Sequence, residues 1–222
     1  MEPTVEQRLT VLADRVGTER TLVYRIALLV CVPILRVLFR PATSGLGDVP
    51  AEGGFILCAN QESNLDGFAL AYALRPRQVY WMGKAELFNR VTRGFLRQVG
   101  IFPVQRGTGD TAAIATAIEL AAGGHIVGIF PEGTRRRKGL RKPLAARPHS
   151  GAARVAIGAG VPLVPAAIRG TERLTALRRW RIAFGAPIAS AEPPEPARPR
   201  ALTDRLWSEI LQLEAELWDR KH

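Results

Sequence analysis

Short apolar runs alternate with segments of helical periodicity over most of this chain. The helical segments have apolar residues three or four positions apart, whereas the strand-like runs are short and nearly continuous. The predicted strands lie in residues 55–60, 78–84, 100–106, 125–135, 161–170 and 179–188. The predicted helices lie in residues 62–75, 85–99, 111–124 and 151–160. This alternation predicts an α/β fold with a mainly parallel central sheet flanked by helices.

Residues 21–40 form an apolar stretch ahead of this alternating pattern. Its apolar part, residues 26–39, is shorter than the roughly twenty residues that span a bilayer, and Pro33 and Arg36 interrupt it. We expect a helix, or two short helices hinged at Pro33, lying in the membrane interface with its arginines toward anionic headgroups. An amphipathic helix packed on the protein core is the alternative.

Turn-rich and proline-rich segments divide the chain into three parts. Residues 41–54 have the composition of a linker, and residues 191–200 that of an extended proline-rich spacer. We expect an N-terminal helical element for the membrane interface at residues 1–45 and an α/β domain at residues 46–190. The remaining part, residues 191–222, comprises the spacer and a C-terminal helix whose apolar face packs on the domain.

The charge of the chain predicts an anionic partner. A formal net charge of +11 fits nucleic acid, an anionic membrane surface or phosphorylated small molecules. No interleaved aromatic and basic pattern supports binding to nucleic acid, so we expect no such partner. The three histidines and two cysteines are scattered along the sequence, which predicts neither a metal site nor a metal cofactor.

Four short motifs follow one another along the chain. They read NQESNLD, GIFPVQR, FPEGTR and VPLVP, at residues 60–66, 100–106, 130–135 and 161–165. Each motif alone is weakly specific, but four in this order are strongly specific. Together they resemble the family of acyltransferases that acylate glycerol 3-phosphate and 1-acylglycerol-3-phosphate, over residues 55–170.

The resemblance implies transfer of a fatty acyl group from acyl-CoA or acyl carrier protein to a hydroxyl of a phosphate-bearing acceptor, such as 1-acylglycerol-3-phosphate. It makes position 61 and Asp66 the catalytic pair, because a base must take the hydroxyl proton and a carboxylate must orient that base. Guanidinium groups suit the acceptor phosphate because they can bind two oxygens at once. The implied substrate-binding residues are Lys84, Arg106, Glu132, Gly133, Thr134 and Arg135, with Glu132 positioning an arginine or the acceptor hydroxyl.

The same resemblance implies where such an enzyme works and what it needs. We expect a peripheral protein at the cytoplasmic face of the cell membrane, in contact with the lipid surface, its acyl donor and a phosphorylated lipid acceptor. The acyl donor is a co-substrate, and no cofactor is expected.

Position 61 departs from the family pattern, which has histidine where this chain has Gln61. A carboxamide exchanges hydrogen bonds but does not take up a proton near neutral pH, so we expect acyl transfer to be absent or impaired. Three explanations stay open. Gln61 is an engineered replacement, or the chain has become a non-catalytic member of the fold that binds lipid or phosphate, or the proton goes to Asp66, Glu62 or the leaving thiolate. His125 is expected to be structural, and His149 to be a loop residue without a role.

Overall fold

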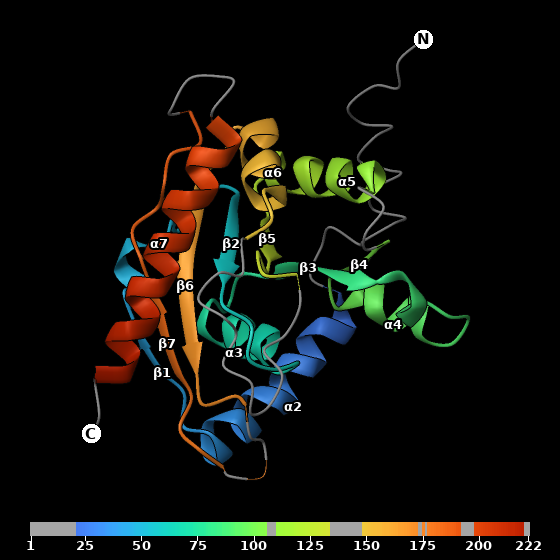
Figure 1. The fold of residues 1–222 in the computed structure, drawn as a ribbon. Helices are drawn as coiled ribbons and strands as arrows, with labels where there is room; N and C mark the ends of the chain where they lie inside the picture. The colour runs from blue at the N-terminus through green and yellow to red at the C-terminus, as the bar shows by residue number, and fades with distance from the viewer. Residues whose placement is uncertain are drawn as a thin grey trace.

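A seven-stranded sheet crosses the protein in the strand order β1-β7-β6-β2-β5-β3-β4 (Figure 1). The computed structural model describes residues 21–105, 110–133, 148–172, 175, 177–191 and 198–219. The strands are β1 (Ala42–Ser44), β2 (Phe55–Ala59), β3 (Val79–Lys84), β4 (Ile101–Val104), β5 (Ile126–Ile129), β6 (Leu163–Arg169) and β7 (Arg181–Phe184). Neighbouring strands run parallel except for β6 and β7, which are antiparallel. The predicted α/β fold with a mainly parallel sheet is therefore confirmed.

Helices cover both faces of this sheet. They are α2 (Leu22–Leu38), α3 (Asp66–Ala73), α4 (Thr92–Gln98), α5 (Thr111–Ala122), α6 (Gly151–Ala159) and α7 (Arg198–Asp219), with the short 3₁₀ helices η1 (Leu46–Asp48) and η2 (Ala85–Leu87). One core cluster joins the sheet to α5, α6 and α7. A second cluster joins the other face to α3 and to the end of α2. The result is a three-layer arrangement with the sheet in the middle.

The central strand β2 is buried on both faces because its sequence is apolar throughout. Ile56 and Cys58 belong to the cluster that contains α5, α6 and α7, whereas Phe55 and Leu57 belong to the cluster on the opposite face. This division follows from the alternation of side chains along a strand. A short run without polar residues is typical of parallel strands that are covered on both sides.

The N-terminal helix α2 is continuous through Pro33, so the alternative of two short hinged helices is wrong. The Thr21 hydroxyl caps the helix by accepting a hydrogen bond of 3.1 Å from the Tyr24 amide. Beyond the other end, the Phe39 ring stacks on the Trp180 ring with centroids 4.3 Å apart. Between these attachments much of the helix is exposed. Among the described residues, no helix has the length and apolar character needed to cross a membrane.

Two segments between predicted elements contain regular structure. The predicted linker at residues 41–54 includes β1, which pairs in parallel with β7. Its three residues are too few for a periodic pattern to be recognised. The spacer predicted at residues 191–200 overlaps α7, which already begins at Arg198. The part of this spacer at residues 192–197 lies outside the described residues.

The single helix predicted at residues 85–99 is divided into η2 and α4. The Asn89 side chain accepts hydrogen bonds of 2.9 Å from the amides of Val91 and Thr92. These bonds satisfy amides that a continuous helix would pair with preceding carbonyls, so a new helix begins at Thr92. Most of the residues between η2 and α4 are exposed.

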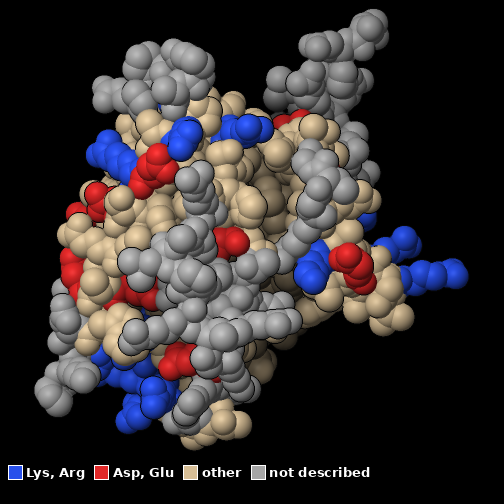
Figure 2. All heavy atoms as spheres, viewed as in Figure 1, with Lys and Arg blue, Asp and Glu red and all other residues tan. Residues whose placement is uncertain are grey.

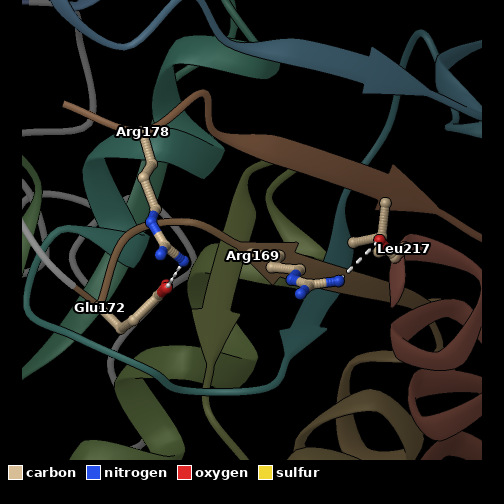
Figure 3. Close-up of polar contacts among 4 residues, drawn as sticks. All are labelled: Arg169, Glu172, Arg178 and Leu217. Carbon is tan, nitrogen blue, oxygen red and sulfur yellow. Dashed lines mark hydrogen bonds and ion pairs between the residues drawn. The ribbon is translucent and has the colours of Figure 1, made fainter. Parts of the chain in front are cut away.

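Arg169 attaches the end of α7 to the end of β6 (Figure 3). Its Nη1 atom donates a hydrogen bond of 3.1 Å to the Leu217 carbonyl oxygen, and its guanidinium lies 3.4 Å from the centroid of the Trp218 ring. A second basic contact in the same view joins Arg178 to Glu172 at 3.6 Å across the connection from β6 to β7. The Arg178 side chain is largely exposed, so this ion pair contributes little to stability.

We predict that Arg169→Ala lowers the free energy of unfolding by about 1–2 kcal/mol, because it removes both the hydrogen bond and the cation–π contact. Urea unfolding followed by circular dichroism would measure this loss. Arg178→Ala is the matched control, with an expected change below about 0.5 kcal/mol. Equal effects of the two substitutions would show that Arg169 does not fasten α7.

Candidate active site

The first and third motifs meet at the edge of the sheet where the parallel strands end. The first motif follows β2, and the third follows the neighbouring strand β5. β2 and β6 point toward α3 and α2 in Figure 1, so this edge faces those helices. In open parallel sheets, ligands bind outside the carboxyl ends of the strands. The topology therefore places the candidate site here.

Asn60 fixes the start of the first motif. Its side chain is buried and makes two hydrogen bonds to Ile168 of β6, donating to the carbonyl oxygen at 3.0 Å and accepting from the amide at 2.7 Å. A side-chain amide that pairs with one residue's backbone in this way extends the ladder between β2 and β6 by one position. The turn after β2 therefore leaves the sheet at a defined point.

Asp66, the first residue of α3, holds the rest of this turn together. Its buried carboxylate accepts hydrogen bonds from the amides of Glu62 at 2.7 Å and Ser63 at 2.8 Å. The hydroxyls of Ser63 and Thr171 also donate to it. Burial raises the pKa of the Asp66 carboxyl above its ordinary value of 3.8, while these hydrogen bonds act in the opposite direction.

The observed hydrogen bonds of Asp66 stabilise the turn that contains Gln61. The carboxylate binds the amides of the two residues directly after Gln61 and the hydroxyl of Thr171 from the end of β6. That Asp66 also orients the side chain at position 61 remains a prediction.

Glu132 connects the third motif to the first. It is buried, and its Oε1 atom accepts a hydrogen bond of 3.2 Å from the Gln61 amide. Gly133 follows with a φ of 64°, a conformation that favours glycine, and its amide donates to the Phe130 carbonyl oxygen at 3.1 Å. The Phe130 ring in turn stacks on Trp81 of β3, with ring centroids 5.2 Å apart.

The sequence does not indicate the bond between Glu132 and the Gln61 amide. The role expected for Glu132, positioning an arginine or the acceptor hydroxyl, stays a prediction. Since a buried carboxylate is costly unless it is hydrogen-bonded, this bond also explains how Glu132 is tolerated at the edge of the core.

His149 lies beside the third motif, although the sequence predicted no role for it. Its amide donates a hydrogen bond of 2.9 Å to the Pro131 carbonyl oxygen. A Cβ atom on Gly133 would come within 3.0 Å of His149 Cδ2 and 3.2 Å of Nε2, so the imidazole lies directly against this glycine. The His149 side chain is exposed. The spacing gave no signal for this contact, because sixteen residues separate His149 from Gly133.

His125 lies at the opposite edge of the sheet, directly before β5. Its ring contacts Tyr80 edge to face, with centroids 5.1 Å apart. Burial, together with the nearby charge of Arg77, lowers the pKa of His125. These contacts agree with the structural role expected for this histidine.

The predicted phosphate-binding residues are only partly covered by the structure. Lys84 ends β3 at the same edge as the first and third motifs, and its side chain is exposed. Arg106, Thr134 and Arg135 lie outside the described residues, so their predicted convergence near Asp66 is not observed directly. In the part of the chain that is described, no group of histidine, cysteine, aspartate or glutamate side chains could hold a metal ion.

We predict that Thr171→Val destabilises the protein by about 1–3 kcal/mol at neutral pH, because it removes a donor to a buried carboxylate. The pKa of Asp66 is higher in the folded protein than its ordinary value. Asp66 therefore contributes to the stability of the fold below its ordinary pKa, and this contribution is lost as the pH rises through the folded pKa. Losing the hydroxyl raises that pKa further. The destabilisation relative to the unchanged protein should therefore be larger at about pH 7 than at about pH 4.

Urea unfolding at the two pH values would test this dependence, with Thr171→Ser as a control that keeps the hydroxyl. A pH-independent loss would mean that the fit of the added methyl group, rather than the lost bond to Asp66, sets the effect.

Comparison with known proteins agrees with this architecture. Residues 40–169 match the Acyltransferase family model. The chain is 33% identical over 177 residues to the 1-acyl-sn-glycerol-3-phosphate acyltransferase of Bacillus subtilis, covering 77% of this chain and 86% of that protein. It is 31% identical over 139 residues to the protein of the same name from Streptococcus pneumoniae, covering 60% of this chain and 50% of that protein.

A solved structure has the same fold. The 1-acyl-sn-glycerophosphate acyltransferase PlsC from Thermotoga maritima superposes with a TM-score of 0.63 at 18% identity, covering 96% of this chain and 83% of that one. At that identity the likeness concerns the fold alone. The family match and the Bacillus subtilis relative carry the assignment, and they confirm the resemblance seen in the four motifs. This chain belongs to the acyltransferase family.

Proposed function

We propose that this scaffold transfers a fatty acyl group from a thioester donor, acyl-CoA or acyl carrier protein, to the hydroxyl of 1-acylglycerol-3-phosphate or a similar acceptor. The relatives that carry this activity in their names support the acceptor class. The observation that carries the proposal is the hydrogen bond from the Gln61 amide to Glu132. It joins the motif proposed for chemistry to the motif proposed for substrate binding.

The proposed reaction is a direct displacement at the thioester. The acceptor oxygen attacks the carbonyl carbon, a new C–O bond forms, the C–S bond breaks, and the thiolate leaves. The hydroxyl proton must be taken up at or before this step, which is the task of a general base. Lys84, Gly133, Arg106, Thr134 and Arg135 are proposed to hold the acceptor phosphate through charge and hydrogen bonds.

Gln61 is proposed to impair the reaction in this chain. Its carboxamide can bind the acceptor hydroxyl but cannot carry the proton. The second candidate function, a non-catalytic module that binds lipid or phosphate, is favoured by this one substitution. Both functions use the same substrate-binding residues, so only a measurement of transfer separates them.

The proposed site of action is the cytoplasmic face of the membrane, with α2 lying in the lipid interface. Two observations support this placement. The described part of α2 exposes large apolar side chains, such as Leu29 at 76% and Val37 at 74%. Its two charged residues, Arg25 and Arg36, are both basic and suit anionic headgroups.

We predict that Gln61→His raises acyl transfer to 1-acylglycerol-3-phosphate by about 10²–10⁴-fold, because it restores a group that accepts a proton near neutral pH. Transfer would be measured with radiolabelled acyl-CoA and, separately, with acyl carrier protein. Gln61→Ala is the control and should give no gain. If the histidine variant binds the acceptor lipid but transfers no acyl group from either donor, the second candidate function, non-catalytic binding of lipid or phosphate, is correct.

A further inference from the structure

The segment between β3 and β4 exposes apolar side chains that the proposed reaction does not use. Leu87 is 53% exposed, Val91 88% and Phe95 56%. We call these three residues the α4 ridge. They lie on η2, on the connection that contains Asn89, and on α4. Apolar side chains this exposed, gathered on one short segment, are typical of interaction surfaces.

The charges around the α4 ridge are mostly basic. Lys84, Arg90, Arg93 and Arg97 are exposed, and Glu86 is the single acidic residue between positions 84 and 98. Figure 2 shows lysine and arginine side chains standing out from the projection that α4 forms in Figure 1. Arginines beside apolar side chains fit a surface with anionic headgroups above an apolar layer.

The α4 ridge lies beside α2. The Thr21 hydroxyl at the start of α2 donates a hydrogen bond of 2.9 Å to the Gln98 carbonyl oxygen at the end of α4. Figure 1 shows the two helices side by side, on the same side of the sheet as the end of β3. An exposed apolar helix and an exposed apolar ridge thus adjoin each other near the candidate site.

We propose that the α4 ridge is a second membrane contact, which inserts into the interface of an anionic bilayer together with α2. Two contacts fix the orientation of the protein on the surface, whereas one helix alone would let it rotate about the helix axis. The orientation presents the edge with the first and third motifs to the bilayer. The joint insertion with α2 and this last statement rest on the proposed function, which places α2 in the lipid interface and takes the acceptor to be a lipid.

Vesicle co-sedimentation tests the α4 ridge without any measurement of activity. The vesicles contain two parts phosphatidylcholine and one part phosphatidylglycerol. The combined variant Leu87→Ser, Val91→Ser and Phe95→Ser should lower the partition coefficient by about tenfold or more. Leu211→Ser is the control, since Leu211 is an exposed apolar residue at 40% on α7, and its effect should stay below about twofold.

Circular dichroism shows whether the triple variant is folded, and light scattering measures its oligomeric state. Unchanged vesicle binding by the folded triple variant overturns the proposal. A variant that keeps vesicle binding but loses transfer from acyl carrier protein assigns the α4 ridge to the donor protein, and one that only converts a dimer to a monomer assigns it to a second copy. Either result also overturns the membrane contact.

A different observation, the contact of His149 with Gly133, carries a second inference. The proposed reaction needs a proton acceptor that Gln61 cannot supply. Asp66 is buried and bound by four donors, and Glu132 is buried and bound to the Gln61 amide. His149 is exposed at the same edge, and a neutral imidazole has a nitrogen that can accept a proton.

His149 and Gln61 both contact the turn of the third motif. Glu132 binds the Gln61 amide, and the next residue, Gly133, lies against the His149 ring. Because Gly133 has no side chain, the His149 ring can approach the backbone of this turn closely. Among the described residues, the charged groups on the adjoining elements are Glu132 on the turn and Arg154 on α6.

We infer that His149 accepts the proton of the acceptor hydroxyl in this chain. The inference rests on the proposed function. As the oxygen attacks the thioester carbonyl, its proton passes to an imidazole nitrogen of His149, and the leaving thiolate takes the C–S electron pair. The imidazolium then returns the proton to water or to the thiolate. Gln61 binds the same hydroxyl without changing its own protonation.

A factorial experiment separates this role from a structural one. His149→Asn should lower the transfer by the unchanged chain by about 10²-fold and change the dependence of the rate on pH. In the Gln61→His background, the same substitution should cost less than about threefold, since the new histidine supplies the base.

Each other outcome has a defined meaning. Equal losses in both backgrounds, or an unchanged pH profile, overturn the role of His149 as the base. If only Gln61→His transfers acyl groups, His149 is not the base but the proposed function stands. If no variant transfers acyl groups, the proposed function fails, and the role of His149 fails with it.

Discussion

The carboxylate of Asp66 must be satisfied where no water reaches it, and much of the local architecture follows from this requirement. A buried ionised group is tolerated only with hydrogen-bond donors around it. Two amides of the preceding turn, the Ser63 hydroxyl and the Thr171 hydroxyl meet this need. The start of α3 is therefore tied to the exit of β6, so the first motif cannot move independently of the sheet.

The same turn is tied to the sheet at two further points. Asn60 pairs with Ile168 of β6, and the Gln61 amide binds Glu132 after β5. The turn is thus held from both neighbouring strands, and the bond at position 61 is made by the backbone amide. These bonds do not depend on the type of side chain at position 61. The turn can therefore keep its place on the sheet with glutamine at this position.

Sequence patterns predicted the parts of the fold that depend on local periodicity. β2, with its uninterrupted apolar residues, and α5, with its regular alanines and glycine end, were placed correctly because packing and propensity agree there. β1 was missed because its three residues gain their structure only by pairing with β7. The break at Asn89 was missed because a side-chain cap competes with an otherwise good helical pattern.

The site was predictable only where a motif names the residue. Asp66 and Glu132 were identified by their motifs, but Thr171 and His149 were not. Both reach the site from segments distant in sequence, and a lone threonine or histidine in a loop has no distinguishing spacing. The one available hint for Thr171 was its position two residues after the end of β6, the strand that contains most of the fourth motif. Arg106, Thr134 and Arg135 stay predictions, since they lie outside the described residues.

The stack of Phe39 on Trp180 has a consequence for depth at a lipid surface. It joins the end of α2 to the segment leading into β7, and the backbones of Phe39 and Trp180 are also hydrogen-bonded. These two contacts restrict the movement of α2 relative to the sheet. In the proposed membrane-bound state, this attachment would set the height of the sheet edge above the headgroups, and that height would select acceptors by the distance between their hydroxyl and their acyl chain.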